Sequence, residues 1–172
     1  MNNKILIIMV VMLLCVGVVN AKPISLAKAV QSTGTWTTTG DAYDFDGTDD
    51  IITIGNVGTT AKTISFWVNL DSTTESILEE TDNVGVSVST GTMSYGSWDN
   101  CFIDGVDTDT ITTGWHHILL TSTTNVDISA LRLGLVNTTY FEGSLAQIRM
   151  WNKELSTEEI AQDYQMYREI YQ

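Results

Sequence analysis

The sequence predicts an all-β domain, a sandwich of two antiparallel sheets, that ends in one C-terminal α-helix. Thr, Ser, Val and Ile recur in short runs, and these residues favour strands. Turn-forming segments such as DGTDD, TDN, DGVD and VNTT separate the runs at short intervals. Many short strands between such turns are typical of an antiparallel sandwich or barrel.

Residues 1–21 are predicted to be a secretory signal peptide. Lys4 precedes a long apolar run, which ends in Val-Asn-Ala, residues suited to signal cleavage. The run is short for a membrane span, although an uncleaved anchor is the alternative. Cleavage would leave residues 22–172 as one secreted or cell-surface domain with no stable membrane insertion.

The strand patterns follow in order along this domain. Residues 22–40 are the least regular and are expected to hold an edge strand and a Thr-rich connection. Clear alternation over 52–54, 84–88 and 131–135 predicts strands that are buried on one face. The segments TISFWVNL and WHHILLT are more uniformly apolar and are predicted to be inner strands.

The C-terminal segment carries a helix signature. Ser156 and Glu159 form a capping box, in which each side chain accepts a hydrogen bond from the backbone of the other residue. Aromatic and aliphatic residues then fall on one helical face: Ile160, Tyr164, Tyr167 and Tyr171. The sequence therefore predicts one helix of about three turns, packed by this face onto the sandwich.

Charge and cysteine content limit the choice of partners. The chain has 21 acidic residues against eight basic ones, for a net charge of −13 at pH 7. This balance argues against nucleic acid and anionic membranes. Cys101 is the only cysteine in residues 22–172, so no intrachain disulfide is predicted there, and its apolar neighbours favour burial.

Five segments occur in the order seen in laminin-G-like and pentraxin-like domains: YDFDGTDDIITI, KTISFWVNLDS, GWHHILLT, LRLG and FEGSLAQIRMWNKELSTEEI. On these segments, residues 42–165 resemble the concanavalin A-like lectin/glucanase superfamily. The resemblance implies a two-sheet jelly-roll sandwich over residues 22–172. It does not imply an activity, because such folds host unrelated functions.

The adjacent His116 and His117 are predicted to be structural, as is Trp115. Neighbouring side chains of a strand point to opposite faces, so the two histidines cannot bind one metal ion from the same side. The pentraxin pattern has a cysteine where this chain has Leu119. The cysteine that would form a disulfide with it falls near Ser65, and it is missing as well. The resemblance thus implies that an apolar-packed core replaces the family's disulfide.

The resemblance also implies a candidate calcium site, the one cofactor that the sequence predicts. Asp82-Asn83 resembles the Asp-Asn pair that supplies calcium ligands in pentraxins, whose other ligands follow LG. Here that loop reads LVNTTYFEG, in which Asn137 alone could serve before Glu142. Calcium needs six or more oxygen ligands, so Asp82, Asn83 and Asn137 form half of such a site.

Two further acidic clusters are predicted to be turns. The first contains Asp44, Asp46, Asp49 and Asp50. It superficially resembles an EF-hand loop, but it lacks the Asp-x-Asp-x-Asp-Gly spacing and the distant Glu, and Asp-Gly is a strong hairpin signal. The second cluster, IDGVDTD, predicts a hairpin turn at Asp104-Gly105 followed by an acidic surface strand.

A second candidate site consists of residues that could bind carbohydrate by stacking aromatic rings on sugar rings. Its candidate ligand-binding residues are Tyr95, Trp98, Asp99 and Asn100. Trp36 and Tyr140 also lie near predicted loops. The alternative is that Tyr95 and Trp98 pack in the core, and a bulge at Gly96 is needed to bring both to one face.

The sequence favours an exported, non-catalytic module that binds carbohydrate or a cell-surface or matrix protein. The alternative is an assembly subunit of a surface or virion structure, including a homo-oligomer. The free Cys101 and the incomplete ligand site favour this alternative. Glycoside hydrolysis comes third. Glu80-Thr81-Asp82 begins a laminarinase-type pattern, but Gly85 stands where the second Glu should be, so no catalytic residue is predicted.

Overall fold

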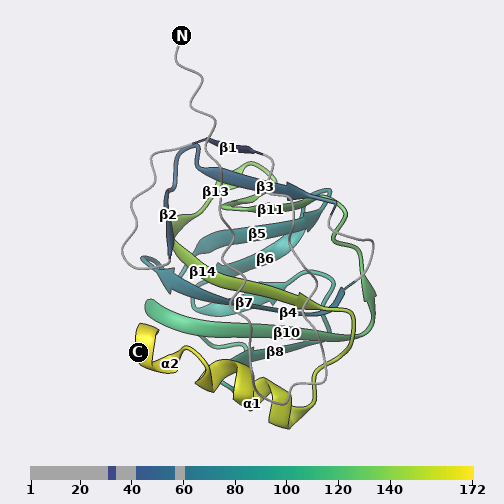
Figure 1. Ribbon diagram of the computed structural model, residues 1–172. Coiled ribbons are helices and arrows are strands. Elements are labelled where there is room, and N and C mark those ends of the chain that lie inside the picture. Colours follow the sequence, from purple (N-terminus) through teal and green to yellow (C-terminus); the bar gives the residue numbers. More distant parts are fainter. Residues whose placement is uncertain (1–30, 34–41, 57–60) are drawn as a thin grey trace.

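The computed structural model describes residues 31–33, 42–56 and 61–172. The predicted signal peptide, Trp36 and most of residues 22–40 lie outside this part. Two antiparallel six-stranded sheets pack face to face, with a small two-stranded sheet beside them (Figure 1). The predicted all-β sandwich with a short C-terminal helix is confirmed.

The first sheet, here called sheet A, contains in spatial order β1 (Gln31–Thr33), β3 (Ile51–Gly55), β11 (Leu131–Leu133), β5 (Glu75–Thr81), β6 (Val84–Ser89) and β7 (Thr92–Tyr95). The second, sheet B, contains β2 (Tyr43–Asp46), β14 (Glu142–Trp151), β4 (Ala61–Leu70), β10 (Gly114–Val126), β8 (Asn100–Ile103) and β9 (Val106–Asp107). The small sheet pairs β12 (Leu135–Val136) with β13 (Thr139–Tyr140). Chain neighbours such as β2 and β3 thus lie in different sheets.

The inner faces of the two sheets form the main core. Alternation places Phe66 and Val68 of β4 inward, where they join Ile118 of β10 and Leu78 of β5 in one buried cluster. All four side chains are fully buried. Complete burial of a side chain of this size stabilises the fold by about 1.5–3 kcal/mol.

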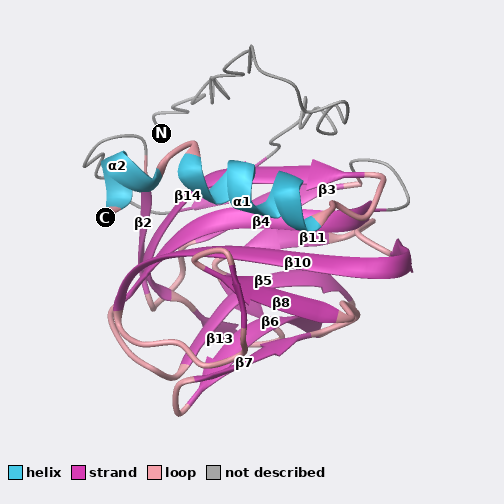
Figure 2. Cartoon of the chain, turned by 90° about the horizontal axis from the view of Figure 1, so that it is seen from below, coloured by secondary structure: helices cyan, strands magenta, loops and turns pink. Residues whose placement is uncertain are grey.

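The outer face of sheet B carries a second apolar layer, covered by the C-terminal segment (Figure 2). Trp67 points outward from β4 and is fully buried beneath this segment, and Trp151 of β14 is 4 % exposed. Both tryptophans are therefore core residues. No helix within the described ranges is long and apolar enough to cross a membrane.

The predicted capping box begins helix α1 (Thr157–Gln165). Ser156 is extended, its hydroxyl accepts from the Glu159 N–H, and its own N–H donates to Glu159 Oε2 at 3.0 Å. The helix ends at Met166, and one further turn, α2 (Arg168–Tyr171), follows a break at Tyr167. The predicted apolar face therefore continues over two helices rather than one.

Replacing Ser156 by alanine is expected to lower the free energy of unfolding by about 1 kcal/mol, because one N-terminal N–H of α1 loses its acceptor. Ser156→Asp keeps an acceptor and should leave stability nearly unchanged. Urea denaturation of the two variants checks this. Equal destabilisation by both substitutions would contradict the capping role.

Candidate functional site

The three candidate calcium residues lie at two turns. Asp82 and Asn83 are the turn between β5 and β6, with φ of +28° and +69°, and Asn137 is in the turn between β12 and β13, with φ of +57°. Asparagine tolerates this left-handed backbone better than most residues. The local sequence therefore favours both turns before any ligand is considered.

The two asparagines converge on a residue that the sequence analysis did not select, Glu79. Its carboxylate accepts a hydrogen bond from the Asn137 N–H at 2.7 Å, and the Asn83 backbone also donates to it. Arg132, directly across the sheet from Glu79, donates its guanidinium to the same carboxylate. Glu79 is fully buried, whereas the Arg132 side chain is 34 % exposed.

The electrostatics of this cluster favour an ionised Glu79. Burial raises the pKa of Glu79, but the hydrogen bonds from Arg132, Asn137 and Asn83 outweigh it and hold the pKa below its usual value. The positive charge beside Glu79 is thus supplied by the protein itself. Asp82 remains exposed at the turn, and calcium binding by Asp82, Asn83 and Asn137 stays a prediction.

Arg132 lies in the middle of a polar outer face of sheet A. It pairs with Thr53 of β3 on one side and with Glu79 of β5 on the other. Further along the sheet, Ser87 of β6 pairs with Ser94 of β7, and both point away from the core. The face therefore combines a guanidinium that Glu79 holds in place, the neighbouring Thr53 hydroxyl, and serine hydroxyls on the strands beyond β5.

The predicted stacking residues have internal roles. Trp98 is 5 % exposed, and its indole N–H donates to Glu80 Oε1 at 2.6 Å. Gly96 adopts φ of +57° and the Trp98 N–H bonds the Tyr95 carbonyl at 3.0 Å, so the chain turns and both rings pack against the main core. Trp98 thus offers no ring face to a sugar, and Tyr95 is half-buried.

Asp99 and Asn100 follow Trp98 and bond to strand β10. Asp99 Oδ2 accepts from the Thr123 N–H at 2.8 Å and from the Ser122 hydroxyl at 3.0 Å. These hydrogen bonds, that of the Thr123 backbone first, lower the pKa of Asp99. Asn100 Nδ2 donates to Thr121 Oγ1 at 3.2 Å. The side chains of Asp99 and Asn100 therefore hold the start of β8 and the residue before it against β10.

Glu80, the acid of the partial glucanase pattern, is fully buried and faces the interior. Besides Trp98, its carboxylate accepts from the Ser97 N–H at 3.3 Å. Burial raises its pKa despite these hydrogen bonds. The Glu80 carboxylate is therefore held inside the sandwich by Trp98 and Ser97.

The two histidines diverge, as predicted. His116 Nδ1 lies 2.8 Å from Asp104, at the turn between β8 and β9, where Asp104 and Gly105 have φ of +53° and +78°. This is the predicted hairpin. His117 is fully buried, and its Nε2 lies 3.0 Å from Asp163 Oδ2 of α1. Both histidines therefore tie structural elements together.

Comparisons with known proteins found no matching family model and no matching curated protein. Among solved structures, the chain is similar to domain 4 of AbnA, a GH43 extracellular arabinanase from Geobacillus stearothermophilus, in complex with arabinotriose. The identity is 14 %, with 81 % of this chain and 84 % of that chain covered and a TM-score of 0.49.

The chain is also similar to the receptor binding domain of botulinum neurotoxin C/D mosaic serotype. The identity is 13 %, with 78 % of this chain and 45 % of that chain covered and a TM-score of 0.47. The chain thus spans less than half the length of that neurotoxin fragment. Both similar structures are β-sandwich folds, and at these identities the likeness concerns the fold alone.

Proposed function

We propose that this domain is an exported, non-catalytic module that binds carbohydrate on the outer face of sheet A, centred on Arg132. The observation that carries the proposal is the Arg132 guanidinium, which Glu79 fixes and which stays partly exposed beside Thr53. Arginine's planar fork of N–H donors suits hydroxyl and carboxylate oxygens, and Glu79 fixes its position before a ligand arrives.

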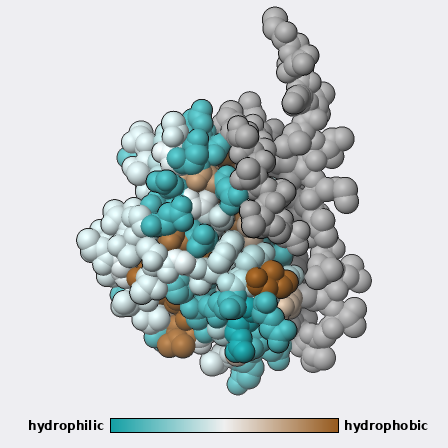
Figure 3. Space-filling view, turned by 90° about the vertical axis from the view of Figure 1, so that its left-hand side faces the viewer, coloured by the Kyte–Doolittle hydropathy of each residue, from teal (hydrophilic) through white to brown (hydrophobic). Residues whose placement is uncertain are grey.

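The contrast between the two outer faces supports this choice. On sheet B, α1 and Tyr167 bury the outward side chains, including Trp67 and Leu119. On sheet A the outward Thr53 pairs with Arg132, and Ser87 and Ser94 lie on β6 and β7, beyond β5; all three are at least partly exposed. The side of the molecule in Figure 3 is mainly hydrophilic where it is coloured, with small separate hydrophobic spots.

The two other functions are less well supported. For hydrolysis, Glu80 would have to face the ligand together with a second carboxylate, but it is buried against Trp98. The free thiol of Cys101 is one feature that favours assembly. However, Cys101 is only 3 % exposed, and burial raises the pKa of its thiol to about 12. A thiol in this state is a poor candidate for an intermolecular disulfide.

A glycan array with the protein expressed from the full sequence tests the proposal, once with calcium and once with chelator. Arg132→Lys keeps a charge beside Glu79 but loses the planar fork, so we expect binding to weaken by at least about tenfold. Arg168→Lys, the matched change on exposed α2, should leave binding unchanged.

Three results would count against this assignment. Equal binding by wild type and Arg132→Lys would place the ligand elsewhere. Binding that needs calcium and is lost in Asp82→Asn would favour the pentraxin-like site. No binding in either condition would reject carbohydrate, and light scattering would then test the assembly alternative, which a strict monomer contradicts.

A further inference from the structure

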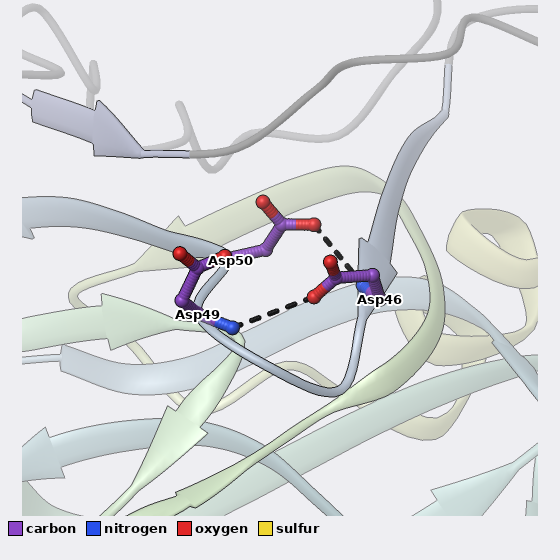
Figure 4. Close-up of side chains that lie close together, drawn as sticks. All are labelled: Asp46, Asp49 and Asp50. Atoms are coloured by element: carbon purple, nitrogen blue, oxygen red, sulfur yellow. Dashed lines mark hydrogen bonds between the residues drawn. The ribbon is translucent and has the colours of Figure 1, made fainter.

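The bend between β2 and β3 gathers three carboxylates. Ligand oxygens of Asp46, Asp49 and Asp50 all lie within 4.8 Å of one another (Figure 4). The predicted turn is present, because Asp46 Oδ1 accepts from the Thr48 N–H at 2.8 Å and from the Asp49 N–H at 3.4 Å. Like charges at this range repel one another. The turn itself does not need three acids so close together.

Asp50 differs from the other two acids in its burial. Unlike Asp46 and Asp49, which are exposed, Asp50 is only 4 % exposed. Its Oδ2 accepts from the Asp46 N–H at 3.0 Å, but its Oδ1 is buried and has no hydrogen-bond partner among the described residues. Burying a carboxylate oxygen without a partner costs free energy, so such a group calls for a missing donor or cation.

The electrostatics agree with this geometry. Burial raises the pKa of Asp50, the Asp46 N–H opposes the shift, and the negative charges of Asp46 and Asp49 raise the pKa further. A divalent cation among the three carboxylates would relieve both the repulsion and the cost of burial.

We propose that Asp46, Asp49 and Asp50 bind a divalent cation, and that Ca²⁺ fits best. All three residues offer oxygen, the donor that calcium prefers, whereas zinc favours nitrogen and sulfur. Two of the three are exposed, which leaves room for the waters that complete a coordination number of six to eight. Magnesium demands a stricter octahedron and dehydrates reluctantly, so it should bind more weakly.

The position of this site gives the cation a structural effect. β2 belongs to sheet B and β3 to sheet A, so the turn joins the two layers at one corner. The Gly47 N–H donates to the Phe141 carbonyl at 2.9 Å, next to the start of β14. A bound ion would therefore brace the corner of the sandwich, and binding to the folded state alone must raise its stability.

Calorimetric titration and thermal unfolding, both on the full chain, test this site. Calcium should bind at one ion per chain, with a dissociation constant in the range of about 10⁻⁴–10⁻³ M. At about 10 mM calcium the melting temperature should rise by about 3–10 °C, the larger value for the tighter binding. Asp50→Asn should weaken calcium binding by at least about tenfold and abolish the rise in melting temperature. Without calcium, this variant should melt at the wild-type temperature or above, because one of the mutually repelling charges is gone.

Two further variants make the outcome unambiguous. Asp49→Asn changes an exposed side chain, so it should fold normally and also lose the calcium effect. Asp82→Asn alters the rival site and should keep the full effect. The assignment is wrong if calcium does not change the melting temperature of the wild type, if Asp50→Asn and Asp49→Asn retain the effect, or if Asp82→Asn alone removes it.

Discussion

Replacing Trp67 by alanine is expected to lower the free energy of unfolding by about 3–5 kcal/mol. The side chain is fully buried between sheet B and the C-terminal helices. Its ring lies 5.0 Å from Tyr171, 5.3 Å from His117 and 6.0 Å from Tyr164. Alanine would leave a cavity at the point where the outer layer meets the sheet, and close packing allows only partial collapse around it.

Guanidinium denaturation followed by circular dichroism measures this loss. Trp67→Phe should cost much less, because it retains an aromatic ring and because the buried Trp67 Nε1 has no hydrogen-bond partner within the described structure to lose. Trp115→Ala, on a half-buried ring 4.6 Å from Tyr171, serves as the neighbouring control. A Trp67→Ala cost no larger than that of Trp115→Ala would contradict the central role of Trp67.

Replacing Asp163 by alanine is expected to cost about 3–5 kcal/mol as well, for an electrostatic reason. Asp163 of α1 is 4 % exposed and lies between His117 and Arg149. Its Oδ1 is 2.8 Å from Arg149 Nη1, and its Oδ2 is 3.1 Å from Nη2, a bidentate pair. Alanine would leave the mostly buried guanidinium without its carboxylate, and uncompensated buried charge is costly.

A double-mutant cycle separates this charge effect from helix packing. Replacing Arg149 by Met together with Asp163→Ala removes both charges, so the double variant should lose less stability than the two single variants add up to. Thermal unfolding of all four proteins measures the coupling free energy. Strict additivity would indicate that the pair contributes no coupling and that α1 is held by its apolar face alone.

Local features were predictable because a few neighbouring residues determine them. Ser156 and Glu159 lie three residues apart, and each satisfies a backbone N–H of the other, so the helix start follows from sequence alone. The Asp104-Gly105 hairpin is similar, since glycine accepts its φ of +78° without strain. The burial of Trp67 followed from its place in a uniformly apolar inner strand.

The candidate site depended on contacts that a single sequence does not display. Glu79 and Arg132 are 53 residues apart, and their pairing follows from the order of strands in sheet A. The choice between an exposed and a buried Trp98 depends on its hydrogen bond to Glu80, a buried acid that a single sequence does not reveal as a core residue. Likewise, DFDGTDD predicts the turn but not the burial of Asp50.

The register between β4 and β10 has a consequence for folding in different redox compartments. Leu119 lies directly opposite Ser65, at the two places where the pentraxin pattern has a disulfide. Both side chains are fully buried, and backbone pairing along β4 and β10 joins these strands without a covalent bond. The strand pair therefore needs neither an oxidant nor a disulfide isomerase to form. Reducing agents should leave the fold intact, and a reducing cytosol should produce it as readily as an oxidising periplasm.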